Sequence, residues 1–584
     1  MLFLDDLPRF LFFTGKGGVG KTSLACASAT RLADEGRRVL LVSTDPASNV
    51  AQVFGQGIGN QITPINAVDG LDAIEIDPQQ AADAYRERII GPVRNLLPAA
   101  EIASITEQLS GSCTTEVASF NEFTDLLADD TRIAGYDHIV FDTAPTGHTI
   151  RLLQLPGEWT SFLDEGKGDA SCLGPMAGLD KTRATYAAAL QRLADPTQTR
   201  LVLVTRAQPS TLAEAERTSA ELAKVGITEQ HLVINALLND PGEDALAHAL
   251  HQREQQAITE LPPLLRTLDR TEIGLRAVAV VGVEQLRELL NPTPEPVDSL
   301  AEPTHVDADG LGALVEELAA QDHGLVMCMG KGGVGKSTVA AAVAMALAER
   351  GKTVHLSTTD PAAHLDDVLA GASDDNLTVS RIDPRAAIQA YRDKVMRTKG
   401  ARLDEAGRAQ LQEDLMSPCT EEVAVFGEFS HLVSQARRQF VVVDTAPTGH
   451  TLLLMDATGS YHRDIMRGMG SATPVTPLMR LQDPELTKMV IVTLPEATPV
   501  QEATDLQEEL RRASIEPWAW VVNQSLAASS TSSPLLKARA SAEEPHLDTV
   551  GKQAHRTAVV PLLAAEPTGA DGLRALIGSL LPSG

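Results

Sequence analysis

The chain has 584 residues and a formal net charge of −29 at pH 7, from 49 Lys and Arg against 78 Asp and Glu. This excess of acid repels polyanions, so it argues against broad binding to nucleic acids or to an anionic membrane surface. The 43% of hydrophobic and 22% of charged residues are ordinary for a soluble globular protein. Aromatic residues make up 3%, which argues against stacking on bases as the main mode of binding.

The N-terminal residues 1–13 are apolar but carry Asp5, Asp6 and Arg9, and they run directly into a glycine-rich loop. This pattern predicts a strand and not a signal peptide. No stretch approaches 18 uninterrupted apolar residues, so direct membrane insertion is not expected. The five cysteines include no CxxC pair, which fits a reducing compartment. We therefore expect a cytoplasmic protein.

The glycine-rich loop at residues 15–22 follows the pattern GxxxxGK[ST]. A buried strand is predicted before it at 9–14 and a helix after it at 23–33. In such a loop the backbone N–H groups wrap phosphate oxygens, Lys21 neutralises their charge, and the hydroxyl of Thr22 can bind Mg²⁺. The residues predicted to bind nucleotide here are Gly15, Gly17, Gly18, Val19, Gly20, Lys21, Thr22 and Ser23.

Further strands are predicted at 38–44, 138–141, 201–205 and 231–235, with helices between them. This alternation predicts an α/β fold with a mostly parallel, doubly wound sheet. Asp45 and Asp142 follow or end two of these strands, at the edge where such sheets bind ligands. We expect Asp45 to position the attacking water and both carboxylates to act toward Mg²⁺, directly or through water. The alternative is that they only cap helices.

The second half of the chain repeats the first. The loop recurs at 330–337, and Asp45-Pro46 recurs as Asp360-Pro361. The segment Ser-Cys-Thr-Thr-Glu-Val at 112–117 recurs as Pro-Cys-Thr-Glu-Glu-Val at 418–423, and Asp-Thr-Ala-Pro-Thr-Gly-His at 142–148 recurs unchanged at 444–450. Four matches in the same order indicate an internal duplication, with a period too long for a solenoid. The equivalent nucleotide-binding residues are Gly330, Gly332, Gly333, Val334, Gly335, Lys336, Ser337 and Thr338. Ser337, Asp360 and Asp444 are the equivalent candidates for Mg²⁺.

We predict an N-terminal ATPase half at 1–290, a linker at 291–310 and a C-terminal ATPase half at 311–584. The linker concentrates proline and acids without apolar periodicity, as in extended spacers. It would keep the two halves at high effective concentration, so that their nucleotide sites can face each other as a pseudo-twofold pair. Residues 525–533, rich in serine, are expected to form a surface loop.

Each loop also carries an additional lysine, Lys16 or Lys331, which marks the deviant Walker A type of P-loop. A cation at the start of the loop reaches phosphates only if the loop faces another charged partner, and the expected partner is the nucleotide of the other copy. The repeated acidic segments suit loops that change conformation when a γ-phosphate leaves. Their candidate switch residues are Asp142, His148, Asp444 and His450. For the histidines, structural hydrogen bonding is the alternative to ligand or switch roles.

The cysteines divide into two groups. Cys26 and Cys328 fall in a predicted helix and a predicted strand, where small core residues are expected. Cys113 and Cys419 occupy equivalent positions of the duplicated segment, whereas Cys172 has no counterpart. Three converging thiolates would suit a soft, thiophilic ion. Because isolated cysteines are usually core residues, both readings stay open on chemistry alone.

Over nearly its full length the chain resembles the arsenite- and antimonite-stimulated efflux ATPases, ArsA, on the strength of the two loops, the two Asp-to-His segments, the linker and the last three cysteines. The resemblance implies a cytoplasmic ATPase whose halves sandwich two ATP molecules with Mg²⁺, and As(III) or Sb(III) bound by Cys113, Cys172 and Cys419. It also implies that Lys16 and Lys331 contact nucleotide held by the opposite half, and that Asn235 and Asn523 help recognise adenine. The implied partners are a membrane arsenite efflux permease at the inner face of the cell membrane and a small arsenic metallochaperone. The chain would act as a monomeric, intramolecular pseudodimer.

The main alternative is a targeting chaperone similar to the ATPases that insert tail-anchored membrane proteins. Those proteins share these loops, but they generally work as homodimers and many carry a zinc-binding CxxC. Here both halves are covalently joined, no CxxC is present, and the methionines of the second half are too few for a client groove. A partitioning or positioning ATPase is a third option, which the acidic charge and the absence of a terminal amphipathic helix disfavour.

Overall fold

A computed structural model describes residues 2–44, 50–91, 112–128, 130–143, 179–291, 308–359, 365–398, 400–404, 419–445 and 476–578, with isolated positions at 94, 98, 102 and 106 and between 407 and 415. Contacts divide the chain into two compact units. The first comprises Met1–Gly242 and Leu250–Pro296, and the second comprises Glu243–Ala249 and Val297–Gly584. Residues 292–307, most of the predicted linker, lie outside the described residues. The predicted boundaries at 290 and 310 therefore stay a prediction.

In the part of the first unit that the structure describes, eight strands form one sheet in the order β3-β4-β2-β5-β1-β6-β7-β8. All neighbours are parallel except the short β3, which pairs antiparallel with β4. The strands are β1 Phe10–Thr14, β2 Val39–Ser43, β3 Thr63–Pro64, β4 Leu71–Glu75, β5 His138–Asp142, β6 Thr199–Thr205, β7 Gln230–Leu237 and β8 Asp269–Gly274.

The central strand β1 is buried along its whole length because helices cover both faces of the sheet. Phe10 and Phe12 pack into one hydrophobic cluster, and Leu11 and Phe13 pack into another. Successive side chains of a strand point to opposite faces, so an unbroken apolar run is the pattern of a strand buried on both sides. The doubly wound fold predicted from the sequence is thereby confirmed.

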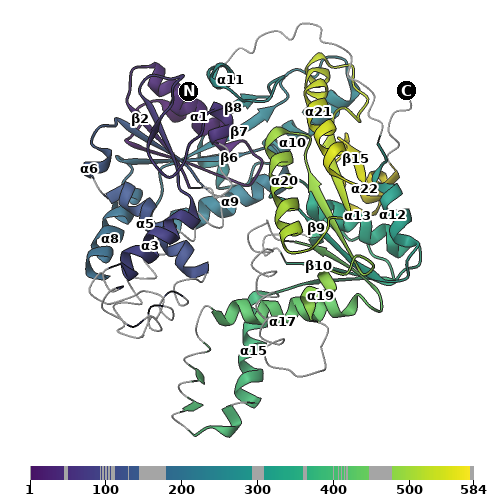
Figure 1. Ribbon diagram of the computed structural model, residues 1–584. Helices are drawn as coiled ribbons and strands as arrows, with labels where there is room; N and C mark the ends of the chain where they lie inside the picture. Colours follow the sequence, from purple (N-terminus) through teal and green to yellow (C-terminus); the bar gives the residue numbers. More distant parts are fainter. Residues whose placement is uncertain are drawn as a thin grey trace. The chain divides into compact units, whose positions relative to one another are not determined.

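Helices lie on both sides of the first sheet (Figure 1), and most of them pack into one of these two clusters. Helices α1 and α11 contribute to one, and α5, α8, α9 and α10 contribute to the other. Helix α3 packs on α5 beyond the sheet. The helices are α1 Lys21–Asp34, α2 Val50–Phe54, α3 Pro78–Ile90, α5 Ser112–Ala128, α6 Asp130–Ile133, α8 Leu179–Ala194, α9 Pro209–Lys224, α10 Ala245–Thr259 and α11 Val283–Leu289. The first residues of α10, 245–249, are grouped with the second unit.

The second unit repeats this plan with a parallel sheet in the order β11-β10-β12-β9-β13-β14-β15, for the residues the structure describes. Strand β9 takes the central place of β1, and its alternate residues again enter two separate clusters. The strands are β9 Gly324–Met329, β10 Val354–Thr358, β11 Leu377–Arg381, β12 Phe440–Asp444, β13 Thr487–Thr493, β14 Ala519–Ser525 and β15 Thr557–Pro561.

Helices α12, α13, α14 and α22 cover one face of the second sheet, and α17, α19, α20 and α21 cover the other. Helix α15 packs on α17 and extends away from the sheet, as Figure 1 shows. The helices are α12 Leu311–Ala319, α13 Lys336–Glu349, α14 Leu365–Leu369, α15 Pro384–Thr398, α17 Cys419–Gln435, α19 Pro477–Leu481, α20 Ala497–Arg512, α21 Pro534–Gln553 and α22 Gly569–Gly578. None of the described helices is both long and apolar enough to cross a bilayer.

Two local predictions were wrong. The N-terminal segment is not one strand: Leu2–Leu4 form a 3₁₀ turn, and β1 begins only at Phe10, two residues after Pro8, which has no N–H to donate. Residues 525–533 are not an open surface loop, because Ser525 ends β14 with 0% exposure and the turn after it is internally hydrogen-bonded.

Candidate functional site

Each unit carries a phosphate loop, residues 15–20 or 330–335, between its central strand and a helix of 14 residues. Helix α1 begins at Lys21 after Gly20, whose φ of 92° lies in the left-handed region, and Gly335 has the equivalent φ of 89°. A Cβ atom at Gly20 would lie 2.3 Å from Asn235 Nδ2. The loop therefore keeps its backbone next to the helix N-terminus, where N–H groups attract anions.

The two loop lysines lie along their own loops. Lys21 is 6% exposed and its Nζ donates to the carbonyl oxygen of Lys16 at 3.1 Å. Lys336 is equally buried and donates to the carbonyl oxygen of Lys331 at 3.0 Å. A buried ammonium group is unfavourable unless anionic or polar groups surround it, so each loop favours a bound anion.

A hydroxyl and a carboxylate meet beside each loop. Thr22 Oγ1 donates to Asp142 Oδ2 at 2.7 Å, and Ser337 Oγ donates to Asp444 Oδ2 at 2.7 Å. Both aspartates end strands next to the central strand and have 0% exposure. Paired oxygen donors of this kind suit Mg²⁺, which prefers hard oxygen ligands and retains several waters.

The two asparagines that the resemblance implies for adenine recognition lie against the phosphate loops of their own units. Asn235 Nδ2 donates to the carbonyl oxygen of Val19 at 2.9 Å, and Asn523 Nδ2 donates to that of Val334 at 3.0 Å. In each unit the asparagine thus fixes one peptide group of the phosphate loop. This contact is distinct from the adenine recognition that the resemblance implies, which stays a prediction.

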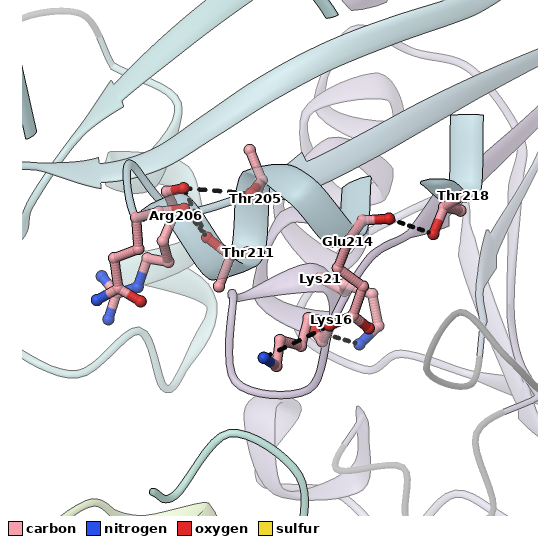
Figure 2. Close-up of polar contacts among 8 residues, drawn as sticks. Lys16, Lys21, Thr205, Arg206, Thr211, Glu214 and Thr218 are labelled. Carbon is pink, nitrogen blue, oxygen red and sulfur yellow. Dashed lines mark hydrogen bonds and ion pairs between the residues drawn. The ribbon is translucent and has the colours of Figure 1, made fainter. Parts of the chain in front are cut away.

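Lys16 and Lys331 each pair with a glutamate of the same unit. Lys16 Nζ lies 3.4 Å from Glu214 Oε2, and Lys331 forms the equivalent ion pair with Glu502. Figure 2 shows Lys16 and Lys21 facing helix α9, which carries Glu214. At the start of α9, Thr211 Oγ1 donates to the carbonyl oxygen of Arg206 at 2.8 Å. The contact of either lysine with nucleotide of the opposite half stays a prediction.

Several predicted site residues lie outside the described residues, namely Asp45, Asp360, His148, His450 and Cys172. For Cys113 and Cys419 only the backbone is described, and it places them in the first turns of α5 and α17. Among the described residues no group of three His, Cys, Asp or Glu has the arrangement of a metal site.

The two remaining cysteines, Cys26 and Cys328, have 0% exposure, as predicted for core residues. Burial raises the pKa of both thiols, so they stay protonated.

Sequence reasoning missed four glutamates that support the site: Glu214 and Glu502 beside the loop lysines, and Glu254 and Glu543 beneath the turns that follow β7 and β14. A signal was available. Glu214 and Glu502 are separated by 288 positions, which is also the separation of Asn235 and Asn523. Aligning the halves through the asparagines would have paired these glutamates.

Two mostly parallel sheets, each with a strand, a phosphate loop and a helix in the same central place, define a P-loop nucleoside triphosphatase with two tandem halves. Comparison with known proteins gives the family. The family described as anion-transporting ATPase, ArsA_ATPase, matches residues 8–292, 323–482 and 475–581. The chain belongs to this family, and it is an ATP hydrolase.

Proteins that are similar to this chain over nearly its full length are named arsenical pump-driving ATPases. The chain is 56% identical over 584 residues to an "Arsenical pump-driving ATPase" of Escherichia coli, covering 99% of this chain and 100% of that protein. It is 36% identical over 621 residues to a "Putative arsenical pump-driving ATPase" of Halobacterium salinarum, covering 97% and 94%. An "ATPase GET3" of Kluyveromyces lactis is 27% identical over 329 residues, which cover 52% of this chain and 94% of that protein. The last similarity spans about one half of the duplication.

Proposed function

We propose that this ATPase drives the export of arsenite or antimonite through a membrane pump. The observation that carries the proposal is the 56% identity, over 99% of the chain, to proteins named arsenical pump-driving ATPases. The protein would work in the cytoplasm and associate with the inner face of the cell membrane through its pump. Its partners would be an arsenite efflux permease and a small arsenic metallochaperone that delivers the metalloid.

In each half, the phosphate loop would bind the ATP phosphates. Lys21 and Lys336 would turn from the loop carbonyl groups toward the β- and γ-phosphate oxygens, and backbone N–H groups of the loop would hold the remaining oxygens. Mg²⁺ would be held by Thr22 with Asp142 and by Ser337 with Asp444, and when bound it supplies charge neutralisation at the phosphates. The short hydroxyl–carboxylate contacts at both loops support this assignment.

Hydrolysis also needs an oriented water and a link to the rest of the protein. Asp45 and Asp360, which follow strands β2 and β10, would orient the attacking water, and they would also approach Mg²⁺ through water. The segments that begin at Asp142 and Asp444 and contain His148 and His450 would act as switches. Thr143 Oγ1 donates to the carbonyl oxygen of Phe13 at 2.8 Å, so the first switch segment begins tied to the central strand.

The two halves would work as an intramolecular pseudodimer in a monomeric chain. Lys16 and Lys331 would leave their glutamate partners and contact the nucleotide of the opposite half, and Asn235 and Asn523 would help to recognise adenine. The domain limits at 290 and 310 belong to this proposal. The duplication supports it, because every described strand of the second sheet has an equivalent, in the same order, in the first sheet.

The metalloid would bind to Cys113, Cys172 and Cys419. Soft thiolates are the ligands that a thiophilic ion prefers, and the other two cysteines are buried, protonated thiols. If the three cysteines meet only when the halves close, the metalloid stabilises closure and so promotes assembly of both ATP sites. Such couplings are typically worth ~1–3 kcal/mol, which corresponds to a change of about 5- to 150-fold in the affinity for ATP when the metalloid is bound.

The test is the ATPase rate of the full-length chain with and without arsenite or antimonite. We expect stimulation in the wild type, and we expect each of Cys113→Ser, Cys172→Ser and Cys419→Ser to lose it while basal ATP binding persists. Cys26→Ala is the matched control, because it removes a thiol from the core and should leave stimulation unchanged. A chain that responds to neither metalloid, or a triple serine variant with full stimulation, contradicts the proposal.

A further inference from the structure

Each unit places a glutamate behind the turn that follows its asparagine-bearing strand, and no step described above uses this carboxylate. Glu543 of the second unit is buried, and Glu254 of the first unit is partly buried. In the second unit Glu543, on α21, is 8% exposed. Its carboxylate accepts three hydrogen bonds: from Ser525 Oγ at 2.8 Å, from the Leu526 N–H at 3.0 Å and from the Ala527 N–H at 3.0 Å. A buried carboxylate with this many donors holds the backbone it contacts in one conformation.

The first unit has the same arrangement in a simpler form. Glu254, on α10, accepts a hydrogen bond from the Leu238 N–H at 2.8 Å. The His251 ring, on the same helix, contacts the Leu238 carbonyl oxygen at 2.6 Å. Leu238, the first residue after β7, is therefore held at its N–H and at its carbonyl oxygen by side chains of α10.

The backbone that these glutamates hold is strained in the same way in both units. Ala236 and Gln524, each directly after the asparagine, have φ angles of 61° and 58°. The pairing of β7 with β8 and of β14 with β15 shifts register at these residues. A residue other than glycine in the left-handed backbone conformation costs free energy of the order of 1–3 kcal/mol. Such a conformation persists only where the surrounding structure stabilises it.

The strained residue connects the buried glutamate to the phosphate loop. In the second unit, Glu543 holds the backbone from residue 525 onward, Gln524 makes the left-handed bend, and Asn523 donates to the Val334 carbonyl oxygen at 3.0 Å. In the first unit the same path runs from Glu254 through Ala236 to Asn235 and Val19. Without the carboxylate, the bend loses the contacts that oppose its strain.

From these contacts we infer that Glu254 and Glu543 are positioning residues for nucleotide binding, which act through the turn and the asparagine on the phosphate loop of their own half. The inference rests on the proposal that these loops bind the nucleotide. The second half is the more strongly held, because Glu543 accepts three hydrogen bonds from the turn where Glu254 accepts one.

The test measures nucleotide affinity in the full-length chain. A Lys21→Ala background disables the first loop, so titration with a fluorescent ATP analogue and Mg²⁺ reports the second site. Glu543→Gln should weaken binding by about tenfold, equivalent to ~1.4 kcal/mol. Glu543→Asp retains the carboxyl group and should recover part of the affinity. Asp548→Asn is the matched control, because it removes an exposed carboxylate from the same helix, and its affinity should stay unchanged.

A second measurement separates positioning from general damage. In the chain with both loops intact, Glu543→Gln should raise the KM for ATP several-fold and change kcat by less than about twofold, since the groups proposed to contact phosphate remain. A folded Glu543→Gln variant with wild-type affinity overturns the inference. If the parent chain binds no nucleotide through the second loop, the proposed site itself fails.

Folding of the variants is checked by their thermal unfolding. If Glu543→Gln does not fold, Ser525→Ala tests instead whether the contacts of Glu543 affect nucleotide binding. It removes one donor to the carboxylate and leaves the two backbone contacts, so we expect affinity about threefold weaker, an effect of well under 1 kcal/mol by the same conversion. Unchanged affinity in a folded Ser525→Ala chain then overturns the inference.

Discussion

Lys16 and Glu214 form an ion pair inside the first unit, with 3.4 Å between Nζ and Oε2. Lys331 and Glu502 repeat the pair in the second unit. Their side chains are only partly exposed, 34% and 18% in the first pair and 19% and 15% in the second. One ammonium group cannot bind a carboxylate and a phosphate equally well at once. On the proposal that each lysine contacts nucleotide, each glutamate would therefore compete with nucleotide for its lysine.

Removing the competing carboxylate should therefore lower the KM for ATP. We expect Glu214→Gln and Glu502→Gln each to lower the KM for ATP by about two- to fivefold, because a partly exposed ion pair is worth ~0.2–1 kcal/mol. The measurement is steady-state ATPase kinetics at low ionic strength and again at high ionic strength, where screening should reduce the difference.

The matched control for this substitution is Glu221→Gln, an exposed glutamate on the same helix α9. Its KM should equal that of the wild type. An unchanged or higher KM in both Glu214→Gln and Glu502→Gln would show that the glutamates do not compete with nucleotide.

The glycine before each loop lysine should tolerate no side chain. Alanine at position 20 would place Cβ 2.3 Å from Asn235 Nδ2, and at position 335 Cβ would lie 2.2 Å from Asn523 Nδ2. We expect Gly20→Ala and Gly335→Ala to abolish nucleotide binding at the altered loop, measured by isothermal titration with ATP and Mg²⁺.

Gly36→Ala separates this clash from backbone strain. Gly36 also has a positive φ, 86°, but a Cβ there meets nothing within 4 Å. It should lower the free energy of unfolding by about 1 kcal/mol and leave ATP binding intact. Equal loss of binding in Gly36→Ala and Gly20→Ala would contradict the proposed role of the asparagine contact.

The sequence was sufficient to predict the fold because its strongest signals are local. The apolar run before Gly15 predicts β1, and the small residues after Lys21 predict α1, both within one or two residues of their observed limits. Asp142 could be placed at a strand end because β5 is a short apolar run that stops there. Parallel pairing then brings the carboxyl ends of β1, β2 and β5 together without further information.

The supporting glutamates could not be predicted in the same way. Glu543 is one of three acids in α21 and follows no motif. Its partners are the Ser525 hydroxyl and two backbone N–H groups, which lie 16 to 18 residues earlier. Its burial depends on how α21 packs against β14, which local periodicity does not specify. The left-handed conformations of Ala236 and Gln524 could not be predicted from the sequence either, since neither residue is a glycine or an asparagine.

The carboxylate beside each loop should control the requirement for Mg²⁺. Asp142→Asn keeps the size of the side chain and its contact with Thr22 but removes the negative charge. We expect the Mg²⁺ concentration for half-maximal ATPase activity to rise by about 10- to 100-fold, the range seen when supporting groups at metal sites are altered. Asp444→Asn should act in the same way through Ser337. A wild-type Mg²⁺ titration in both variants would refute their assignment to the metal.

Protonation of Glu543 should make the stability of the second unit depend on pH. Burial raises the pKa of Glu543 from 4.5 to about 7, and the hydrogen bonds from Ala527, Leu526 and Ser525 and the charge of Arg539 only partly oppose it. Because the folded-state pKa lies above the unfolded-state value, the stabilising contribution is complete below about pH 4.5 and is lost as the pH rises through 7. The full effect is of the order of 3 kcal/mol. Urea unfolding at about pH 5.5 and about pH 8 should therefore show a wild-type stability that falls, relative to Glu543→Gln, as the pH rises. Parallel stabilities of the two proteins at both pH values would mean that Glu543 stays ionised across this range.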